Sequence, residues 1–380
     1  MIKTNTDSSN LETSQISTVE LFSGIGGFRI AADKLGIKTI FANDINPLSC
    51  NVYRANFGPD EIVESDIRNN VDLVPNHDLL TGGFPCQPFS SAGKKEGVRD
   101  PRGTLFQIIA DILDRTQPKY FILENVKRLL TMEEGSHFAT ILSTLSSLKY
   151  WIEWRLLNAK DFHLPQNRER ILICGRKISF ENPENEYHRN IKLVSPLSVS
   201  TLFFGKRFFP EIDSWNSIES HGKRFPEWGV AYKGNFWGHD LTDKNLAQTV
   251  LLRDVLEANP SPEYDLTDQT LSRLPRNACV NKFINGVEVI SNQAGGARMG
   301  YTIFGVNGLA PTLTASTSRH YERYKIDGKY RRLTPVEYAR LQGFPDDHCR
   351  MASSYDQYSL YGNAVPPPMV EWVMKQWLRE

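Results

Sequence analysis

The sequence predicts an α/β fold in which a mostly parallel sheet carries helices on both faces and a smaller, loop-rich domain follows. Two observations carry this prediction. From Thr18 to about Arg176, short β-rich runs alternate with helical stretches, which is typical of repeated β–α units. From about Lys177 to Lys329 this alternation ends, and Pro, Gly, Asn and aromatic residues become frequent.

Six strands are expected in the first part, each a short run rich in Ile, Val, Phe, Leu or Tyr. They cover residues 18–22, 38–44, 77–83, 119–125, 150–159 and 170–176. Three stretches repeat apolar residues with a helical period, and the first of them closes on Gly36, as helices commonly do. The three predicted helices cover residues 26–36, 104–118 and 136–150.

Length and composition set the broad class. A chain of 380 residues is longer than a single hydrophobic core usually supports, so two domains, or one large domain with an insertion, are expected. Lys+Arg and Asp+Glu both number 44, and this zero net charge neither supports nor excludes a nucleic-acid partner. No apolar run approaches the roughly 20 residues that span a bilayer, and residues 1–17 are predicted to be a disordered tail.

The five cysteines are odd in number and lack CxxC spacing. We therefore expect neither a disulfide framework nor a metal site, and a reducing cytoplasm fits best. In such a compartment one cysteine can carry chemistry, and the other four are expected to be small buried hydrophobes.

Several polar or glycine-rich motifs follow predicted strands, and in a parallel sheet such strand ends gather at one edge, where ligands bind. The turn FSGIGG can bring backbone N–H groups to a ligand, although glycine turns also link many strands and helices. Asp44 ends the next strand, where a carboxylate can accept bonds from ribose hydroxyls. The full GxGxxG pattern is missing, which favours an adenosine-type cofactor over NAD. Asp66 follows the β-like run EIVESD and either reaches the adenine or is a surface aspartate.

Cys86 lies in GGFPCQPFS, at a predicted strand end and between two prolines. A structural thiol is the usual interpretation of a lone cysteine, but prolines that fix a loop suit an exposed reactive group. Glu124 in ENV and Arg168 and Arg170 in QNRER are expected at the same sheet edge. A thiolate, a carboxyl acid and a guanidinium there could attack, protonate and hold a flat heterocycle. The alternative is that Glu124 simply pairs with an arginine.

Two helices are expected near the C-terminus. RRLTPVEYARLQGFP places Pro335 in a first helical turn. The second helix covers residues 370–378 and is amphipathic, packing one apolar face against the protein. That face consists of Val370, Val373, Met374 and Trp377.

The motifs FSGIGG, GGFPCQPFS, ENV, QNRERI, RRLTPVEYARLQGFP and YGNAVP occur in the order found in DNA (cytosine-5)-methyltransferases. They span nearly the whole chain, from Phe22 to Pro366, and the chain resembles the bacterial restriction–modification enzymes of this family. The resemblance implies a Rossmann-like, S-adenosylmethionine-dependent methyltransferase sheet with a smaller, loop-rich target-recognition domain. It implies transfer of a methyl group to carbon 5 of a cytosine flipped out of duplex DNA.

The resemblance also implies roles for the residues at the sheet edge. The Cys86 thiolate adds to carbon 6, Glu124 binds ring nitrogen 3 and the exocyclic amine, and Arg170 holds the carbonyl oxygen. Arg168 supports the loop or a phosphate, and Gln87 belongs to the same catalytic motif. The sequence does not identify the base that removes the carbon 5 proton, for which a water is plausible.

S-adenosylmethionine is the cofactor that the resemblance implies. Its binding residues are expected to be Phe22, Gly24, Ile25, Gly26, Asp44, Ile45, Asp66, Ile67, Pro85, Leu105, Asn363 and Val365. Two positions depart from the family pattern. Ile45 stands where an aromatic residue is frequent, which weakens adenine stacking, and Leu360 replaces a frequent glutamine three residues before Asn363.

Double-stranded DNA is the expected partner. The loop after Cys86 is predicted to close over DNA, and a basic stripe from Arg319 to Arg332 is expected to contact phosphate. The residues expected to bind DNA are Ser90, Lys94, Arg102, Arg298, Arg319, Arg323 and Arg331.

The resemblance divides the chain into five segments. They are a tail at 1–17, a catalytic and cofactor-binding domain at 18–190, a target-recognition domain at 191–330, a hinge and DNA-facing segment at 331–360, and a returning segment at 361–380. A cytoplasmic, nucleoid-associated monomer paired with a restriction endonuclease of the same specificity is expected. Three alternative functions account for part of these features: a methyltransferase acting on tRNA, a catalytically silent DNA-binding regulator, and a nicotinamide dehydrogenase.

Overall fold

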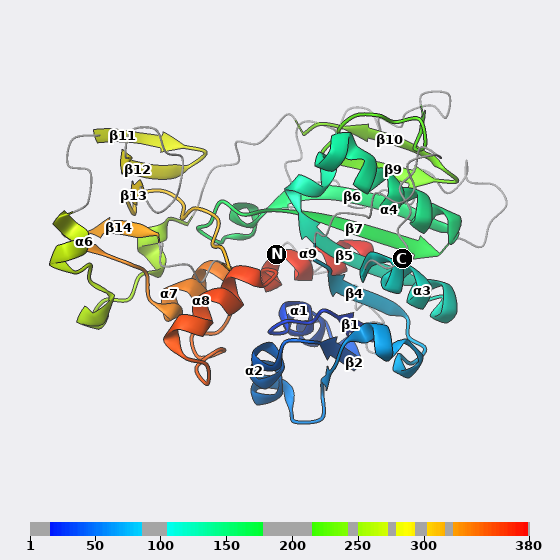
Figure 1. The fold of residues 1–380 in the computed structure, drawn as a ribbon, viewed down its shortest axis with the longest axis horizontal. Coiled ribbons are helices and arrows are strands. Elements are labelled where there is room, and N and C mark those ends of the chain that lie inside the picture. The colour runs from blue at the N-terminus through cyan, green and yellow to red at the C-terminus, as the bar shows by residue number, and fades with distance from the viewer. Residues whose placement is uncertain are drawn as a thin grey trace, which may run out of the picture.

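The computed structural model describes residues 16–85, 105–177, 215–241, 250–272, 279–292, 302–315 and 322–378. These residues form two parts, a large α/β part and a smaller part built on a second sheet (Figure 1). Helices α7 and α8 lie between the two sheets in this view. Within the described ranges no helix has the length and apolar character needed to cross a membrane.

The large part is built on a ten-stranded sheet with the order β3-β2-β1-β4-β5-β7-β6-β9-β10-β8. Its first five strands are parallel, and each of the predicted strands in this half is present. They are β1 (Ser17–Leu21), β2 (Lys38–Asp44), β3 (Val63–Glu64), β4 (Leu79–Gly83) and β5 (Tyr120–Val126).

The other half of the sheet is antiparallel, so the prediction of a mostly parallel sheet is wrong for these strands. They are β6 (Tyr150–Asn158), β7 (Glu169–Lys177), β8 (Asn216–Ser217), β9 (Trp228–Tyr232) and β10 (Asn235–His239). Residues 159–168 join β6 to β7 without a crossover helix, whereas a parallel pair needs a connection of about a dozen residues or more. The chain therefore reverses direction after β6, and β7 pairs with β6 in the antiparallel orientation.

Helices cover both faces of the sheet, as predicted. Side chains of β5 alternate between two cores, with Phe121 and Leu123 in one and Tyr120 and Ile122 in the other. The first core receives α3 (Leu105–Thr116) and α4 (Ser136–Ser147), and the second receives α1 (Gly27–Lys34) and α9 (Pro367–Trp377). Helix α2 (Pro47–Phe57) packs beside β2 at the sheet edge.

The C-terminal helix confirms its predicted packing. Val370, Val373, Met374 and Trp377 are all buried in α9, and α1 packs against this helix. The helix begins three residues before the predicted start because Pro367, whose fixed φ and missing N–H suit a first turn, opens it.

The smaller part contains a five-stranded sheet, β11-β12-β13-β14-β15. Its strands are β11 (Cys279–Ile284), β12 (Val287–Asn292), β13 (Thr302–Phe304), β14 (Arg323–Ile326) and β15 (Lys329–Arg331), with the short helix α6 (Asp268–Ser272) nearby in sequence. Its core is shared with α7 (Pro335–Gln342) and α8 (Ser354–Asn363), and also takes Ile25 and Val52 from the large part.

The described residues between 191 and 330 contribute strands to two different sheets, which differs from the single target-recognition domain expected there. Strands β8, β9 and β10 fall inside this range but extend the main sheet beyond β6. The Trp228 indole N–H donates to Glu153 Oε1 at 3.0 Å, and the Trp154 indole N–H donates to the Pro226 carbonyl at 2.9 Å. The composition of this region suggested an irregular structure, but these two indole hydrogen bonds attach it to β6 of the main sheet.

The two parts meet at the segment that precedes β7. Gln166 is fully buried and donates to the Leu341 carbonyl at 3.1 Å, while its own oxygen accepts from the Leu313 N–H at 3.1 Å. The Asn167 N–H donates to the Ala310 carbonyl at 2.9 Å. The sequence QNRER thus joins the main sheet, the second sheet and α7 through its backbone and one buried amide.

Candidate active site

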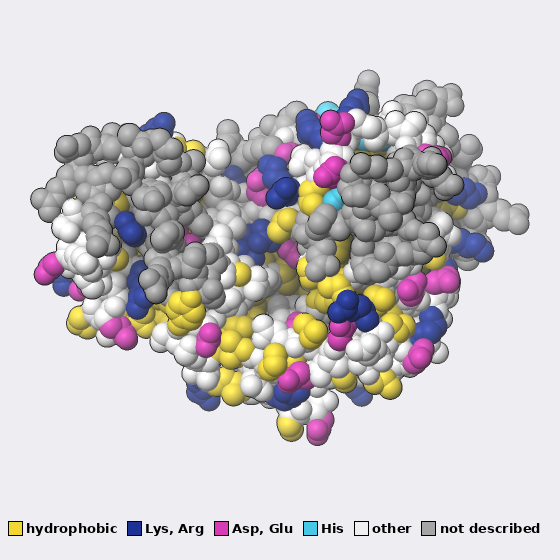
Figure 2. Space-filling view, viewed as in Figure 1, with side chains coloured by type: hydrophobic (Ala, Val, Ile, Leu, Met, Phe, Trp, Pro, Cys, Tyr) yellow, Lys and Arg dark blue, Asp and Glu magenta, His cyan; other side chains and the backbone are white. Residues whose placement is uncertain are grey.

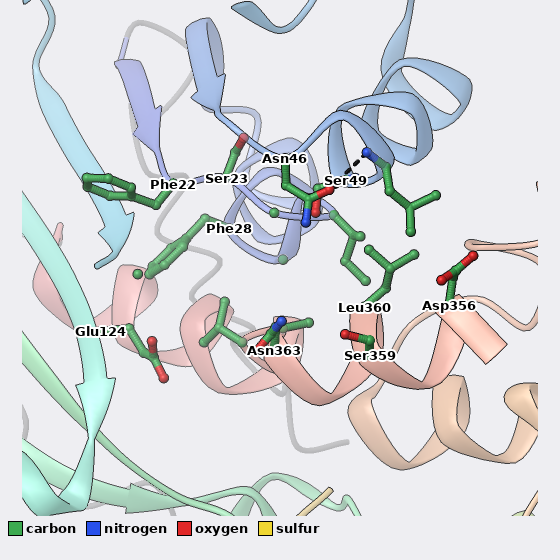
Figure 3. Close-up of a pocket in the computed structure, with 17 residues that line it drawn as sticks. Phe22, Ser23, Phe28, Asn46, Ser49, Glu124, Asp356, Ser359, Leu360 and Asn363 are labelled. Carbon is green, nitrogen blue, oxygen red and sulfur yellow. Dashed lines mark hydrogen bonds between the residues drawn. The ribbon is translucent and has the colours of Figure 1, made fainter. Parts of the chain in front are cut away.

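A cavity of about 250 Å³ opens beside the ends of β1 and β4, between the glycine-rich turn and α8 (Figure 3). Its wall combines backbone from the turn with side chains from α2, β5 and α8. The lining residues are Phe22, Ser23, Gly24, Ile25, Gly27, Phe28, Asn46, Leu48, Ser49, Gly83, Glu124, Asp356, Ser359, Leu360, Asn363, Ala364 and Val365.

The glycines of the turn are required for different physical reasons. Gly24 has φ +53° and nothing within 4 Å of an added Cβ, so its backbone faces open space. Gly26 has φ +85°, and an added Cβ would lie 2.4 Å from the Phe57 ring. A Cβ on Gly27 would lie 2.5 Å from the Val365 carbonyl oxygen, so this glycine lets the C-terminal segment approach the start of α1.

Asp44 holds the turn from the end of β2. Its carboxylate accepts the Gly24 N–H at 2.8 Å and the Asn46 N–H at 2.8 Å. Burial raises the pKa of Asp44, and the hydrogen bonds from these two N–H groups act in the opposite direction. Ile45, the next residue, is 62% exposed, so it offers a bare apolar surface beside the carboxylate.

Glu124 and Arg170 meet at the edge of the cavity. Glu124 Oε1 lies 2.9 Å from Arg170 Nε, and the two side chains are only 13% and 12% exposed. Because β7 runs antiparallel to β5, Arg170 at the start of β7 pairs with Val126 at the end of β5. Burial raises the pKa of Glu124 despite the charges of Arg170 and Arg168, and burial lowers the pKa of Arg170.

The segment leading to Cys86 is attached to the same strand. The Asn125 side-chain amide donates to the Phe84 carbonyl at 2.9 Å, and a Cβ on Gly83 would lie 3.1 Å from Glu124 Oε2. Pro85 is exposed and is the last described residue before position 105. The predicted site residues Cys86, Gln87, Ser90, Lys94 and Arg102 lie outside the described residues.

Arg168 supports the loop around Asn363. It is fully buried, and its guanidinium donates to the carbonyls of Leu313 at 2.9 Å, Gly362 at 2.9 Å and Ala364 at 2.8 Å. Burial, and next the charge of Arg170, hold its pKa well below the usual value. Support of a loop is one of the two roles expected for Arg168, and these hydrogen bonds are contacts of that kind.

Helix α8 presents one stripe to the cavity. Asp356, Ser359, Leu360 and Asn363 recur at helical spacing and all line it, followed by Val365 (Figure 3). Asn363 and Val365, two of the expected cofactor-binding residues, thus both line this cavity. Leu360 also lies here, so the departure from the family's glutamine makes this part of the wall apolar.

Three of the expected cofactor-binding residues, Phe22, Leu105 and Ile67, belong to or pack against the first core. Phe22 and Leu105 both pack against that core, and Ile67 is 2% exposed within it. Asp66 is bound by a neighbour, because Arg68 Nη2 lies 2.5 Å from its Oδ2, and hydrogen bonds from Arg68 lower the pKa of Asp66. An adenine contact by Asp66 would therefore compete with this ion pair.

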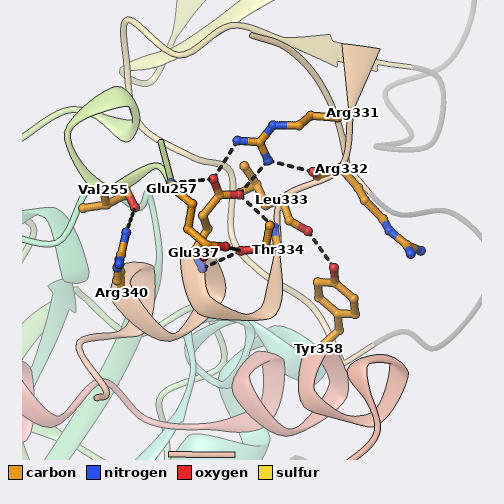
Figure 4. Close-up of polar contacts among 9 residues, drawn as sticks. All are labelled: Val255, Glu257, Arg331, Arg332, Leu333, Thr334, Glu337, Arg340 and Tyr358. Atoms are coloured by element: carbon orange, nitrogen blue, oxygen red, sulfur yellow. Dashed lines mark hydrogen bonds and ion pairs between the residues drawn. The ribbon is translucent and has the colours of Figure 1, made fainter. Parts of the chain in front are cut away.

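Arg331 belongs to a buried network (Figure 4). Its guanidinium makes hydrogen bonds of 2.8 and 2.6 Å to Glu337, and the two side chains are 5% and 0% exposed. In this structure Arg331 faces the interior and offers no surface to a phosphate. Arg323 is half-buried in β14. The other two predicted arginines of this region, Arg298 and Arg319, lie outside the described residues.

Charge is not segregated on the face shown in Figure 2, where basic and acidic side chains are interspersed among the described residues. Yellow apolar side chains gather in the hollow between the two parts. Any affinity for phosphate on this face therefore rests on local groups, consistent with the zero net charge of the chain.

Sequence reasoning missed several residues of the cavity wall. Asn46 caps α2. The sequence contains the pattern that predicts this cap, because an Asn directly before a proline is typical of a helix start. Leu48 and Ser49 follow it into the cavity. The helical spacing from Asn363 back to Asp356 would have placed the latter on the same face, had a helix been predicted there.

Comparisons with known proteins agree with this architecture. Among solved structures, the chain aligns with a mutant DNMT2 of Spodoptera frugiperda at a TM-score of 0.63 and 18% identity, covering 96% of this chain and 100% of that one. The S. pombe Dnmt2 methyltransferase aligns at a TM-score of 0.61 and 18% identity, covering 96% and 98%. The large part therefore has a Rossmann-like methyltransferase fold, as expected from the sequence motifs.

Sequence comparison is more specific. A family model for C-5 cytosine-specific DNA methylases matches residues 16–379. The Type II methyltransferase M.NgoBI of Neisseria gonorrhoeae is 35% identical over 363 residues, covering 94% of this chain and 92% of that protein. The Type II methyltransferase M.HhaI of Haemophilus parahaemolyticus is 31% identical over 360 residues, covering 93% and 92%. The chain belongs to the C-5 cytosine-specific DNA methylase family and is a DNA (cytosine-5)-methyltransferase.

Proposed function

We propose that this enzyme methylates one cytosine within a specific sequence of duplex DNA, using S-adenosylmethionine, as part of a Type II restriction–modification system. The observation that carries the proposal is the Glu124–Arg170 pair, held at 2.9 Å beside a cavity whose far wall is the glycine-rich turn. A site for a flat heterocycle and a site for an adenosyl compound thus share one opening. The names of the Type II relatives support the biological setting.

The residues present fit S-adenosylmethionine. The turn presents open backbone at Gly24, Asp44 stands behind it, and Ile45 is an exposed apolar surface for adenine. Asn363 and Asp356 on α8 bring an amide and a carboxylate to the opposite wall, where an amino-acid group can be bound. When bound, the cofactor supplies a methyl group on a sulfonium, which is an excellent leaving group.

The chemistry of the chain's own residues begins at Cys86. Its thiolate forms a bond to carbon 6 of cytosine, and the electron pair of the 5,6 double bond is delocalised toward nitrogen 3. A protonated Glu124 donates to nitrogen 3, and the raised pKa of this buried carboxyl favours the protonated form that the step requires. Arg170 contacts Glu124 before the base arrives and then binds the carbonyl oxygen.

Carbon 5, now enamine-like, takes the methyl group and still carries its proton. Loss of that proton to a base returns an electron pair to the ring, the bond between carbon 6 and sulfur breaks, and the Cys86 thiolate is released. A water is our candidate for the base. The target base must first leave the helical stack, because neither face of carbon 6 is accessible within duplex DNA.

The biological role follows from these steps. Methylation of its recognition sequence would protect host DNA from a cognate endonuclease, and the loop after Cys86 is proposed to close over the flipped base. The predicted contacts of Ser90, Lys94, Arg102 and Arg323 with DNA belong to this proposal. So does the cytoplasmic, monomeric, nucleoid-associated state expected from the sequence.

Methyl transfer from tritium-labelled S-adenosylmethionine to duplex DNA and to tRNA tests the substrate. Label is expected in DNA only, and none is expected with Cys86→Ala. Bisulfite sequencing of DNA from expressing cells should then show one protected cytosine within a recurring sequence. Label in tRNA alone, or unmodified DNA in those cells, would refute the proposal.

A further inference from the structure

We infer that His348 is a positioning residue for the cofactor-binding turn, acting from the loop that joins α7 to α8. This inference rests on the proposed binding of S-adenosylmethionine and assigns it a further determinant. His348 Nε2 lies 2.7 Å from the carbonyl oxygen of Ile25, the central residue of the turn. Because a carbonyl can only accept, Nε2 must carry the proton and donate it.

The histidine ring is fixed rather than free to turn away. It is 3% exposed and packs between Phe344, at 4.9 Å between ring centroids, and Phe57, at 6.1 Å. Burial lowers the pKa of His348, which keeps the ring neutral with a single N–H on the nitrogen that meets Ile25. The donor is therefore held in one place by packing.

The same loop also holds the opposite wall of the cavity. The N–H of Cys349 donates to the Tyr361 hydroxyl at 3.2 Å, and Tyr361 lies two residues before Asn363. The His348 carbonyl accepts from the Asn56 side chain of α2 at 2.8 Å. Two adjacent residues thus connect the glycine-rich turn, α2 and α8, which together surround the cavity.

The connection matters because Ile25 belongs to both parts of the protein. It lines the cofactor cavity, and it also belongs to the hydrophobic core shared by α7, α8 and the second sheet. The hydrogen bond from His348 to the Ile25 carbonyl fixes the position of the turn relative to that core. Without this donor, the turn would lose one of the contacts that keep its N–H groups aimed at the cofactor.

His77 provides a matched control. It is also buried, at 8% exposure, its Nδ1 lies 2.8 Å from the Pro75 carbonyl, and burial lowers its pKa. His77 does not line the cavity. Replacing either histidine by phenylalanine keeps a buried ring and removes one hydrogen bond to a carbonyl, so a general effect on stability should be similar for both.

The test compares His348→Phe, His348→Gln and His77→Phe by steady-state kinetics. His348→Phe is expected to raise KM for S-adenosylmethionine about five- to ten-fold, while KM for DNA and kcat stay within about two-fold. His348→Gln, whose amide can reach the same carbonyl, should restore KM to within about two-fold. His77→Phe should change thermal stability alone.

Equal effects of His348→Phe and His77→Phe on KM for S-adenosylmethionine would overturn the inference, as would an unchanged KM in a folded His348→Phe protein. If His348→Phe does not fold, His348→Asn, whose shorter amide cannot reach Ile25, replaces it with the same expectations. Wild-type protein that binds no S-adenosylmethionine by calorimetry would instead refute the proposed function, so the two failures are distinguishable.

Discussion

Replacing Arg331 with methionine should destabilise the protein without changing how the protein binds DNA phosphates. The guanidinium makes two hydrogen bonds to Glu337 and a third, of 3.0 Å, to the Arg332 carbonyl, all in the interior. Removing one partner of a buried ion pair costs about 3–5 kcal/mol, because the other charge is left uncompensated.

The lower end of that range applies here. Glu337 keeps the backbone N–H of Thr334 at 2.8 Å and that of Glu257 at 3.0 Å, so its carboxylate is not left without donors (Figure 4). We therefore expect a loss of about 3 kcal/mol in the free energy of unfolding, measured by urea denaturation followed by far-ultraviolet circular dichroism.

The salt dependence of DNA binding separates this role from a phosphate contact. An arginine that neutralises one phosphate contributes about one unit to the slope of log K against log salt. We expect the slope to be unchanged in Arg331→Met. A stability within 0.5 kcal/mol of wild type, combined with a slope reduced by about one, would show that Arg331 leaves the interior to bind DNA.

Three further predictions address the catalytic acid, the cofactor site and a buried carboxyl. Glu124→Gln should lower kcat about 100- to 1000-fold while leaving S-adenosylmethionine binding intact by calorimetry, and a kcat within ten-fold would contradict the proposed role. Ile45→Trp should tighten S-adenosylmethionine binding about three- to ten-fold, since a 62%-exposed apolar surface becomes a stacking platform; no change would place adenine elsewhere. Glu20 in β1 is buried with its pKa raised to about 8, so its folded form binds a proton more tightly than its unfolded form. Its contribution to stability should be full below about pH 4.5 and lost as pH rises toward 8, and Glu20→Gln should remove that loss in thermal melts at pH 5 and pH 8.

The sequence was most informative where local patterns decide structure. Apolar runs bounded by Gly, Asn and Asp located β1, β2, β4 and β5, and Gly24, Gly83 and Glu124 line one cavity because parallel strands end at the same edge. Glu124 and Arg170 were expected at the same sheet edge, and an ion pair of Glu124 with an arginine was the alternative to a catalytic role. Antiparallel pairing of β7 with β5 explains why Arg170, at the start of β7, meets Glu124, near the end of β5.

Long-range packing was beyond the reach of such patterns. Strands β9 and β10 contain Gly229, Gly238 and clustered tryptophans, a composition that indicates loops, yet β9 pairs with β6 across a long interval of sequence and β10 pairs with β9. The basic stripe before position 332 suggested a surface, but Arg331 is neutralised by Glu337 on α7. Only tertiary structure shows which arginine faces inward.

Trapping of a covalent complex tests the central chemical claim most directly. Duplex DNA with 5-fluorocytosine at the target position cannot lose a proton from carbon 5, so the bond between sulfur and carbon 6 should persist once methyl transfer has occurred. Incubation with S-adenosylmethionine is expected to yield a denaturation-resistant adduct that peptide mass spectrometry assigns to Cys86. Methyl transfer to ordinary DNA without any adduct at Cys86 would contradict the mechanism proposed for this enzyme.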